Sequence, residues 1–118
     1  MIYRFKQIEL DTEKFTVTSN GELQPIEPRV FNLITFLVDN KDKIVSRDEL
    51  LKHVWQERLV SDTSINNTIK SARQALGDDG KKQQVIKTIH SRGYQFIAEL
   101  ETQTPIKGIN ENAKQSGK

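Results

Sequence analysis

The chain has 118 residues, of which 35% are hydrophobic and 29% charged, and its formal net charge is +2. This length fits one domain with one core, and no apolar run approaches the roughly 20 residues that span a bilayer. Without cysteine there is neither a disulfide framework nor a thiolate metal site. The first ten residues lack the apolar core of a secretory signal, so a reducing, cytoplasmic setting is expected.

The N-terminal third predicts a small antiparallel sheet. Polar and apolar residues alternate near the start of the chain, with the apolar ones at Tyr3, Phe5, Ile8 and Leu10, as in strands that bury one face. Two more β-prone runs, 15–19 and 22–26, are separated by Asn20-Gly21, a dipeptide typical of tight hairpins. Pro25 places the last run at an edge of the sheet or at its exit.

Two helices are predicted next. The first begins at Pro28, repeats apolar residues at helical spacing, and ends at the polar run that starts at Asp39. The second covers about 46–55, because Ser46 and Glu49 have the spacing of a capping box. The connection 56–60 follows it.

A third helix is predicted at 63–76, with Ser61 or Asp62 as its N-cap and Gly77 after its end. At 100° per residue its apolar residues form one stripe, namely Ile65, Ile69, Ala72 and Leu76. The opposite face is polar and contains Thr63, Asn67, Lys70, Ser71 and Gln74. Asn66 and Arg73 lie together on one flank, where they are expected to contact something that runs alongside the helix.

The β-prone runs 85–90 and 94–98 are joined by Ser91-Arg92-Gly93 and predict a hairpin with a basic tip. The loop before it contains Asp78-Asp79, which is typical of solvated turn residues. The expected fold class is therefore α+β: a winged helix-turn-helix with an N-terminal antiparallel sheet, three helices and a C-terminal hairpin wing. The domain is expected to cover 1–100.

Positive charge is concentrated late in the chain. Residues 1–62 carry nine Lys and Arg against eleven Asp and Glu, a net of −2, whereas residues 63–94 carry six against two, a net of +4. A basic stretch over the third helix and the hairpin is what a nucleic-acid-binding surface requires.

The sequence resembles the winged-helix effector domains of the OmpR/PhoB type, which include one-component regulators of the ToxR/CadC kind. The similarity follows roughly residues 3–98. Its most specific parts are Val45-Ser46-Arg47-Asp48-Glu49-Leu50 followed by Val54-Trp55, then Val60-Ser61-Asp62, Ala72-Arg73 and Ala75-Leu76-Gly77-Asp78, and finally Arg92-Gly93-Tyr94.

This resemblance implies that the recognition helix 63–76 enters the major groove and that the wing 85–98 reaches the adjacent minor groove or backbone. The matching positions give candidate base-reading residues, which are Asn66, Asn67, Lys70 and Ser71. Positions that match phosphate contacts of the family are Trp55, Thr63, Thr68, Arg73 and Thr88. His90 and Arg92 lie in the wing.

The chemistry of these side chains suits the implied roles. Asn can pair with an adenine edge and Lys can donate to guanine, while Arg and Thr can donate to phosphate oxygens. Many response regulators have arginine where this chain has Ser71 and valine where it has Asn67, so their base preferences do not transfer. Trp55 also fits the role of a core anchor, and Tyr94 is expected to pack against the sheet.

No enzyme is expected, and no catalytic residue, metal or cofactor is predicted. His53 and His90 have no partners at metal-ligand spacing. His90 and Ser91 are neighbours in a hairpin and so point to opposite faces, which does not suit a base and its nucleophile.

The expected function is sequence-specific binding of double-stranded promoter DNA by a bacterial transcriptional regulator. The alternative is a winged-helix protein–protein interaction module, because a net charge of +2 is modest for a DNA-binding protein. The resemblance implies head-to-tail dimers on direct repeats, and the connection 56–60 is a candidate contact with RNA polymerase.

The polar segment 101–118 predicts a flexible linker. Because the domain begins almost at Met1, a one-component regulator without a preceding receiver domain is expected. The linker leads to a membrane span, to a cytoplasmic sensory domain or to neither, and the sequence does not choose among them. The domain is expected in the cytoplasm, either free or as the cytoplasmic part of an inner-membrane-anchored regulator, and without membrane contact of its own.

Overall fold

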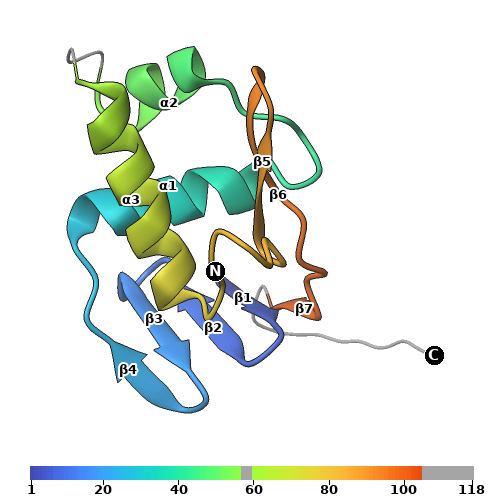
Figure 1. Ribbon diagram of the computed structural model, residues 1–118. Coiled ribbons are helices and arrows are strands. Elements are labelled where there is room, and N and C mark those ends of the chain that lie inside the picture. The colour runs from blue at the N-terminus through green and yellow to red at the C-terminus, as the bar shows by residue number, and fades with distance from the viewer. Residues whose placement is uncertain (57–59, 105–118) are drawn as a thin grey trace.

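The computed structural model describes residues 1–56 and 60–104. Four strands come first, β1 (Ile2–Phe5), β2 (Ile8–Asp11), β3 (Thr16–Ser19) and β4 (Glu22–Gln24). The helices α1 (Pro28–Asp39), α2 (Arg47–His53) and α3 (Asp62–Ala75) follow, and then β5 (Ile86–Ile89), β6 (Gly93–Phe96) and β7 (Thr102–Thr104). The α+β winged-helix architecture predicted from the sequence is confirmed (Figure 1).

The N-terminal sheet has the strand order β4-β3-β2-β1-β7, with antiparallel neighbours throughout. Asn20 and Gly21 both have positive φ, 52° and 81°, so they form the tight turn that the dipeptide predicted. The strand predicted at 15–19 begins one residue later, because Phe15 adopts a φ of 57° and turns the chain. Its exposed ring packs edge-on against Phe31 of α1 at 5.5 Å between centroids.

The last strand corrects the predicted boundary of the linker. β7 pairs with β1, with Thr104 opposite Ile2, and the Glu101 N–H donates to the Arg4 carbonyl at 2.7 Å. Such pairing satisfies backbone groups that β1 would otherwise leave open at an edge. Because this pairing is made by backbone groups, the polar sequence of the segment did not predict it. The rest of the predicted linker, 105–118, lies outside the described residues.

Local capping determines where the second and third helices begin. In α2 the Ser46 Oγ accepts from the Glu49 N–H at 3.1 Å, and the Glu49 carboxylate accepts from the Ser46 N–H at 3.0 Å, which confirms the capping box. In α3 the cap is Ser61, whose Oγ accepts from the Ser64 N–H at 3.1 Å. α2 is shorter than predicted, since it ends at His53.

The core joins the sheet, the helices and the hairpin. Phe5 of β1 and Phe96 of β6 are both fully buried, and their rings meet edge to face at 5.0 Å. α1 and α3 pack against each other, and Figure 1 shows α1 crossing behind α3 towards the hairpin. No helix in the described part of the chain combines the length and apolar character needed to cross a membrane.

The part of the hairpin next to its turn is fixed against the segment that precedes α2. Val45 and Tyr94 exchange two backbone hydrogen bonds, of 2.7 and 2.9 Å. Gly93 has a φ of 143°, and a Cβ at this position would overlap the carbonyl oxygen of Val45. Only glycine therefore allows the hairpin to approach so closely, and this contact sets its direction relative to α2.

Candidate nucleic-acid interface

One side of α3 is buried and the other is open. The buried residues are Ile65, Ile69, Ala72 and Arg73. The open face presents Thr63, Asn67, Lys70, Ser71 and Gln74. This confirms the predicted amphipathic helix, with Arg73 as an unexpected member of the buried side.

The four candidate base-reading residues spread across the open face. From the wing side to the sheet side they follow the order Asn66, Lys70, Asn67 and Ser71, over an arc of about 140°. Ser71 lines a concavity of about 330 Å³ that it shares with Gln24 and Val30. A ligand that contacts all four must therefore be as broad as the helix itself, and the edges of several successive base pairs in a major groove satisfy this requirement.

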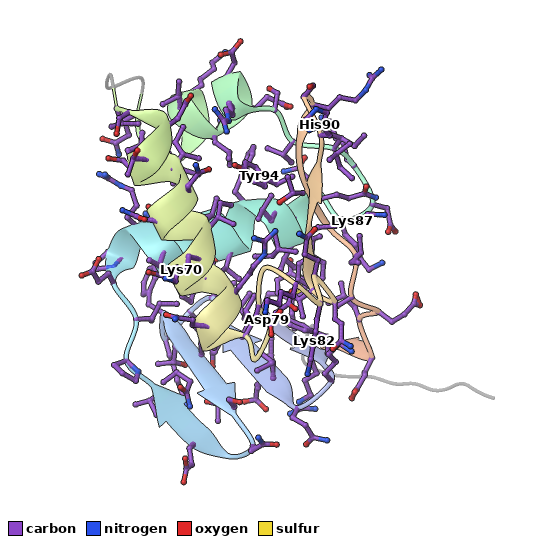
Figure 2. All side chains as sticks on the ribbon, in the orientation of Figure 1. Lys70, Asp79, Lys82, Lys87, His90 and Tyr94 are labelled. Atoms are coloured by element: carbon purple, nitrogen blue, oxygen red, sulfur yellow. The ribbon has the colours of Figure 1, made fainter. Side chains whose placement is uncertain are left out.

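Asn66 is joined to β6 of the wing, near the turn of the hairpin. The Tyr94 hydroxyl donates to the Asn66 Oδ1 at 3.1 Å, although the two residues are 28 positions apart. Tyr94 is buried, as predicted, and Figure 2 shows it between α3 and the hairpin. The side chain is therefore more than a packing element, because its hydroxyl reaches a candidate base-reading residue.

Arg47 connects the first turns of α2 and α3. Its Nη1 lies 2.7 Å from the Asp62 carboxylate. The pKa of Arg47 is raised above its ordinary value, first by a hydrogen bond and charge interaction with Tyr94 and then by those with Asp62. Two polar contacts therefore connect α3 to its neighbours: the Asp62–Arg47 ion pair joins it to α2, and the Asn66–Tyr94 hydrogen bond joins it to β6.

Arg73 is not the exposed flank residue that the helical wheel predicted. It is only 8% exposed, and its Nε and Nη2 donate to the Ile86 carbonyl at 3.1 Å and to the Thr88 Oγ1 at 2.8 Å. Burial lowers the pKa of this guanidinium, and the charge of Asp78 offsets part of that effect. Arg73 ties α3 to β5, and a phosphate contact from its remaining nitrogen stays a prediction.

The loop before the wing is held by a buried carboxylate. Asp78 is 7% exposed and accepts from the N–H groups of Gln84, Val85 and Ile86 at 2.8–3.1 Å. Burial alone would raise its pKa, but these hydrogen bonds outweigh that effect and lower it. The prediction of a solvated turn residue was therefore wrong for Asp78, while Asp79 is exposed as expected.

Trp55 and Thr68, two of the predicted phosphate contacts, have partners inside the protein, and their phosphate contacts stay predictions. Trp55 is 2% exposed, with the Arg29 guanidinium 5.6 Å from its ring centroid, so it acts as the core anchor considered as an alternative. The Thr68 hydroxyl donates to the Ser64 carbonyl at 2.9 Å. Its one hydrogen is thereby used inside the helix, whereas a phosphate oxygen needs a donor.

For the other two threonines, Thr63 and Thr88, the structure leaves the side chain accessible to a phosphate. Thr63 is exposed on the first turn of α3. Thr88 is exposed on β5 and accepts from Arg73, so its own hydroxyl hydrogen remains available to an external acceptor. Such a hydroxyl, oriented by a buried guanidinium, suits a phosphate oxygen.

The wing presents His90 and Arg92 at its tip, and both side chains are exposed; Figure 2 shows His90 at the end of the hairpin. Together with Ser46, Arg47 and Asp48 before and in α2, the residues 88–94 border a groove of about 540 Å³. The open face of α3 and this groove are therefore neighbours, joined at Tyr94. Residues 57–59, most of the predicted polymerase contact, lie outside the described residues.

The sequence reasoning missed the roles of Arg47, Asp62 and the Tyr94 hydroxyl. Arg47 and Tyr94 belong to the motifs that carried the resemblance, but a motif does not say which polar atoms meet. The contacts depend on how α2, α3 and β6 pack together, and no local pattern contains that information.

Comparison with known proteins gives the same fold. Residues 21–96 match a protein family described as "Transcriptional regulatory protein, C terminal". The chain is similar to the transcriptional activator CadC of Escherichia coli, with 30% identity over 82 residues, which cover 69% of this chain and 16% of the relative.

Two solved structures are also similar. The Klebsiella pneumoniae RstA DNA-binding domain in complex with the RstA box has a TM-score of 0.70 and 25% identity, covering 81% of this chain and 96% of that one. Thermotoga maritima DrrB, a response regulator described as an OmpR/PhoB homologue, has a TM-score of 0.74 and 34% identity, covering 81% and 44%. The chain spans only 16–31% of the lengths of three curated activators that it matches.

Proposed function

We propose that this chain binds double-stranded promoter DNA sequence-specifically for a bacterial transcriptional regulator. The chain belongs to the family of C-terminal domains of transcriptional regulatory proteins, which matches it over residues 21–96. In this proposal α3 enters the major groove and the wing lies on the adjacent minor groove or backbone. The chain acts by binding and catalyses no reaction.

The observation that carries the proposal is the continuity of the open face of α3 with the wing. Asn67 and Lys70 project from the middle of α3, while Arg73 and Tyr94 hold the wing beside it. Residues 63–94, which contain most of α3 and of the wing, carry a net charge of +4. A similar fold in the RstA complex is bound to its DNA box, which supports the same mode of binding here.

The geometry also supports a division of roles. Asn67 and Lys70, in the middle of the open face, and Asn66, at its wing-side edge, are the side chains that we expect to read base edges, whereas Ser71 lies at the opposite edge. Thr63, Thr88 and Arg92 are placed to hold the backbone on either side. Backbone contacts set affinity and register, and base contacts set sequence preference.

A titration of duplex DNA at several salt concentrations tests the proposal. The logarithm of affinity should fall by about 0.9 for each contacted phosphate per tenfold rise in salt, and selection from a random DNA pool should enrich a defined sequence. Salt-independent behaviour with no duplex binding would instead favour the alternative of a protein–protein interaction module.

We extend the proposal to three features of the whole regulator. Two copies are expected to bind head to tail on direct repeats, which predicts a selected sequence with two equally oriented half-sites. The connection 56–60 is the proposed contact with RNA polymerase, so substitutions there should reduce transcription without reducing DNA affinity. DNA binding requires access to the chromosome, so we place the domain in the cytoplasm, either free or tethered to the inner membrane.

A further inference from the structure

We propose that Tyr94 determines the base preference of Asn66 by holding its amide in one orientation, with Oδ1 towards the wing and Nδ2 towards DNA. The inference rests on the proposed function and deepens it: it names Tyr94 as a positioning residue and the kind of base edge that Asn66 recognises. The observation behind it is the hydrogen bond of 3.1 Å from the Tyr94 hydroxyl to Asn66 Oδ1.

The direction of this hydrogen bond sets the orientation of the amide. The phenol has a single hydrogen, and it is directed to the Asn66 Oδ1. The Asn66 amide accepts through Oδ1, so its Nδ2, which carries the two donors, is turned the other way.

The contacts around Tyr94 hold its hydroxyl, and therefore the Asn66 amide, in one orientation. Tyr94 is 4% exposed and its backbone is paired with Val45, so the hydroxyl cannot move far. Asn66 itself is exposed, so the outward Nδ2 is accessible to a ligand in the groove.

An outward Nδ2 offers donors only. The matching base edges are those with acceptors: guanine has two adjacent ones, O6 and N7, thymine has O4, and adenine has only N7, next to its N6 amino donor. The bidentate contact of an asparagine with adenine needs an acceptor and a donor side by side, which this orientation does not present. We therefore expect guanine or thymine to be preferred over adenine at the base that faces Asn66, because the adenine amino group adds a donor beside its single acceptor.

The first test uses Tyr94→Phe, which removes one oxygen atom. The base pair read by Asn66 is located first, as the position where Asn66→Ala relaxes the preference of the wild-type protein. Affinities for duplexes with each of the four base pairs there are then compared. Tyr94→Phe frees the amide to rotate, so the preference for guanine or thymine over adenine should fall about tenfold.

Tyr3→Phe is the matched control. Tyr3 is another buried tyrosine, and its hydroxyl donates to the Asp39 carboxylate at 3.0 Å in a different part of the molecule. It should leave the preference unchanged. A Tyr94→Phe profile equal to that of wild type, or an adenine at the wild-type position, would overturn the inference.

Asn66→Asp provides a second test that leaves Tyr94 intact. One carboxylate oxygen accepts from Tyr94 and the other faces the groove as an acceptor, so the preference should move to cytosine or adenine, whose amino groups donate. A preference still for guanine or thymine would contradict the inference. These outcomes leave the proposed function standing, because it fails only if no duplex is bound in a salt-dependent manner.

Discussion

The Arg73 guanidinium donates to the Thr88 Oγ1 at 2.8 Å, which connects the recognition helix to the wing. A second hydrogen bond, from Arg73 Nε to the Ile86 carbonyl, fixes the same strand at 3.1 Å. Arg73 therefore holds α3 and β5 at a fixed spacing. We expect it to contribute to the proposed DNA binding through this connection as well as through a phosphate contact.

Arg73→Ala is expected to lower the free energy of unfolding by about 2–4 kcal/mol, because it leaves the buried Ile86 carbonyl without its partner and removes packing. DNA affinity should fall on all duplexes by a similar factor, since the spacing of helix and wing is lost. Urea denaturation and anisotropy titrations measure the two effects. Lys70→Ala, at an exposed position of the same helix, should change stability by less than about 0.5 kcal/mol; equal losses in the two variants would contradict the connecting role.

Lys70→Ala is expected to change sequence preference. The side chain projects from the middle of the open face of α3 and can donate to guanine O6 and N7. The variant should lose about 1–3 kcal/mol of discrimination at one base pair, measured by the affinities for single-substitution duplexes. A uniform loss on every duplex would show instead that Lys70 contacts only the backbone.

Arg92→Ala and Thr88→Val should separate charge from hydrogen bonding in the wing region. Each variant is expected to bind every duplex more weakly, by about the same factor for all sequences. Only Arg92→Ala should reduce the slope of log affinity against log salt, by about 0.9, because it removes a cation that displaces a counterion. Thr88→Val removes a neutral donor and should leave the slope unchanged. If Arg92→Ala kept the wild-type slope, Arg92 would not contact a phosphate.

Gly93→Ala is expected to destabilise the protein by about 3 kcal/mol or more, because the new Cβ overlaps the Val45 carbonyl and forces the hairpin away. Gly77→Ala is the control: its φ of 73° is also positive, but nothing lies within 4 Å of the added carbon. That variant should lose only about 1–2 kcal/mol. Thermal unfolding compares the two, and similar losses would show that the close approach is unimportant.

Asp78 should make stability depend on acid pH. The pKa of Asp78 is lowered in the folded protein. The stability that this carboxylate contributes is therefore fully present above its pKa in the unfolded chain, about 4, and is lost as pH falls through its pKa in the folded protein. Urea midpoints between pH 7 and pH 2 measure the loss. Asp78→Asn should be less stable at pH 7 and should lose less on acidification; an unchanged acid profile would count against the role of this carboxylate.

Features with a local cause were predictable from the sequence. The positive φ of Asn20 and Gly21, the Ser46–Glu49 capping box and the buried stripe of α3 each arise from residues within a few positions of one another. Their physical causes are backbone preference, capping hydrogen bonds and helical periodicity, which act before any tertiary contact forms. The same local patterns gave the order of the elements, and the resemblance to a family then supplied the candidate contacts with DNA.

The tertiary structure alone decided which polar groups from distant parts of the sequence form hydrogen bonds with each other. Tyr94 and Asn66 are separated by 28 positions and Arg73 and Thr88 by 15, while β7 lies at the opposite end of the described chain from its partner β1. A helical wheel predicts the direction of the Arg73 side chain, but it does not predict that β5 packs against this side chain and buries it. The sequence by itself determined a polar helix beside a basic hairpin, and the packing of α2, α3 and β6 determined how those side chains are held, because such contacts form only after distant segments come together.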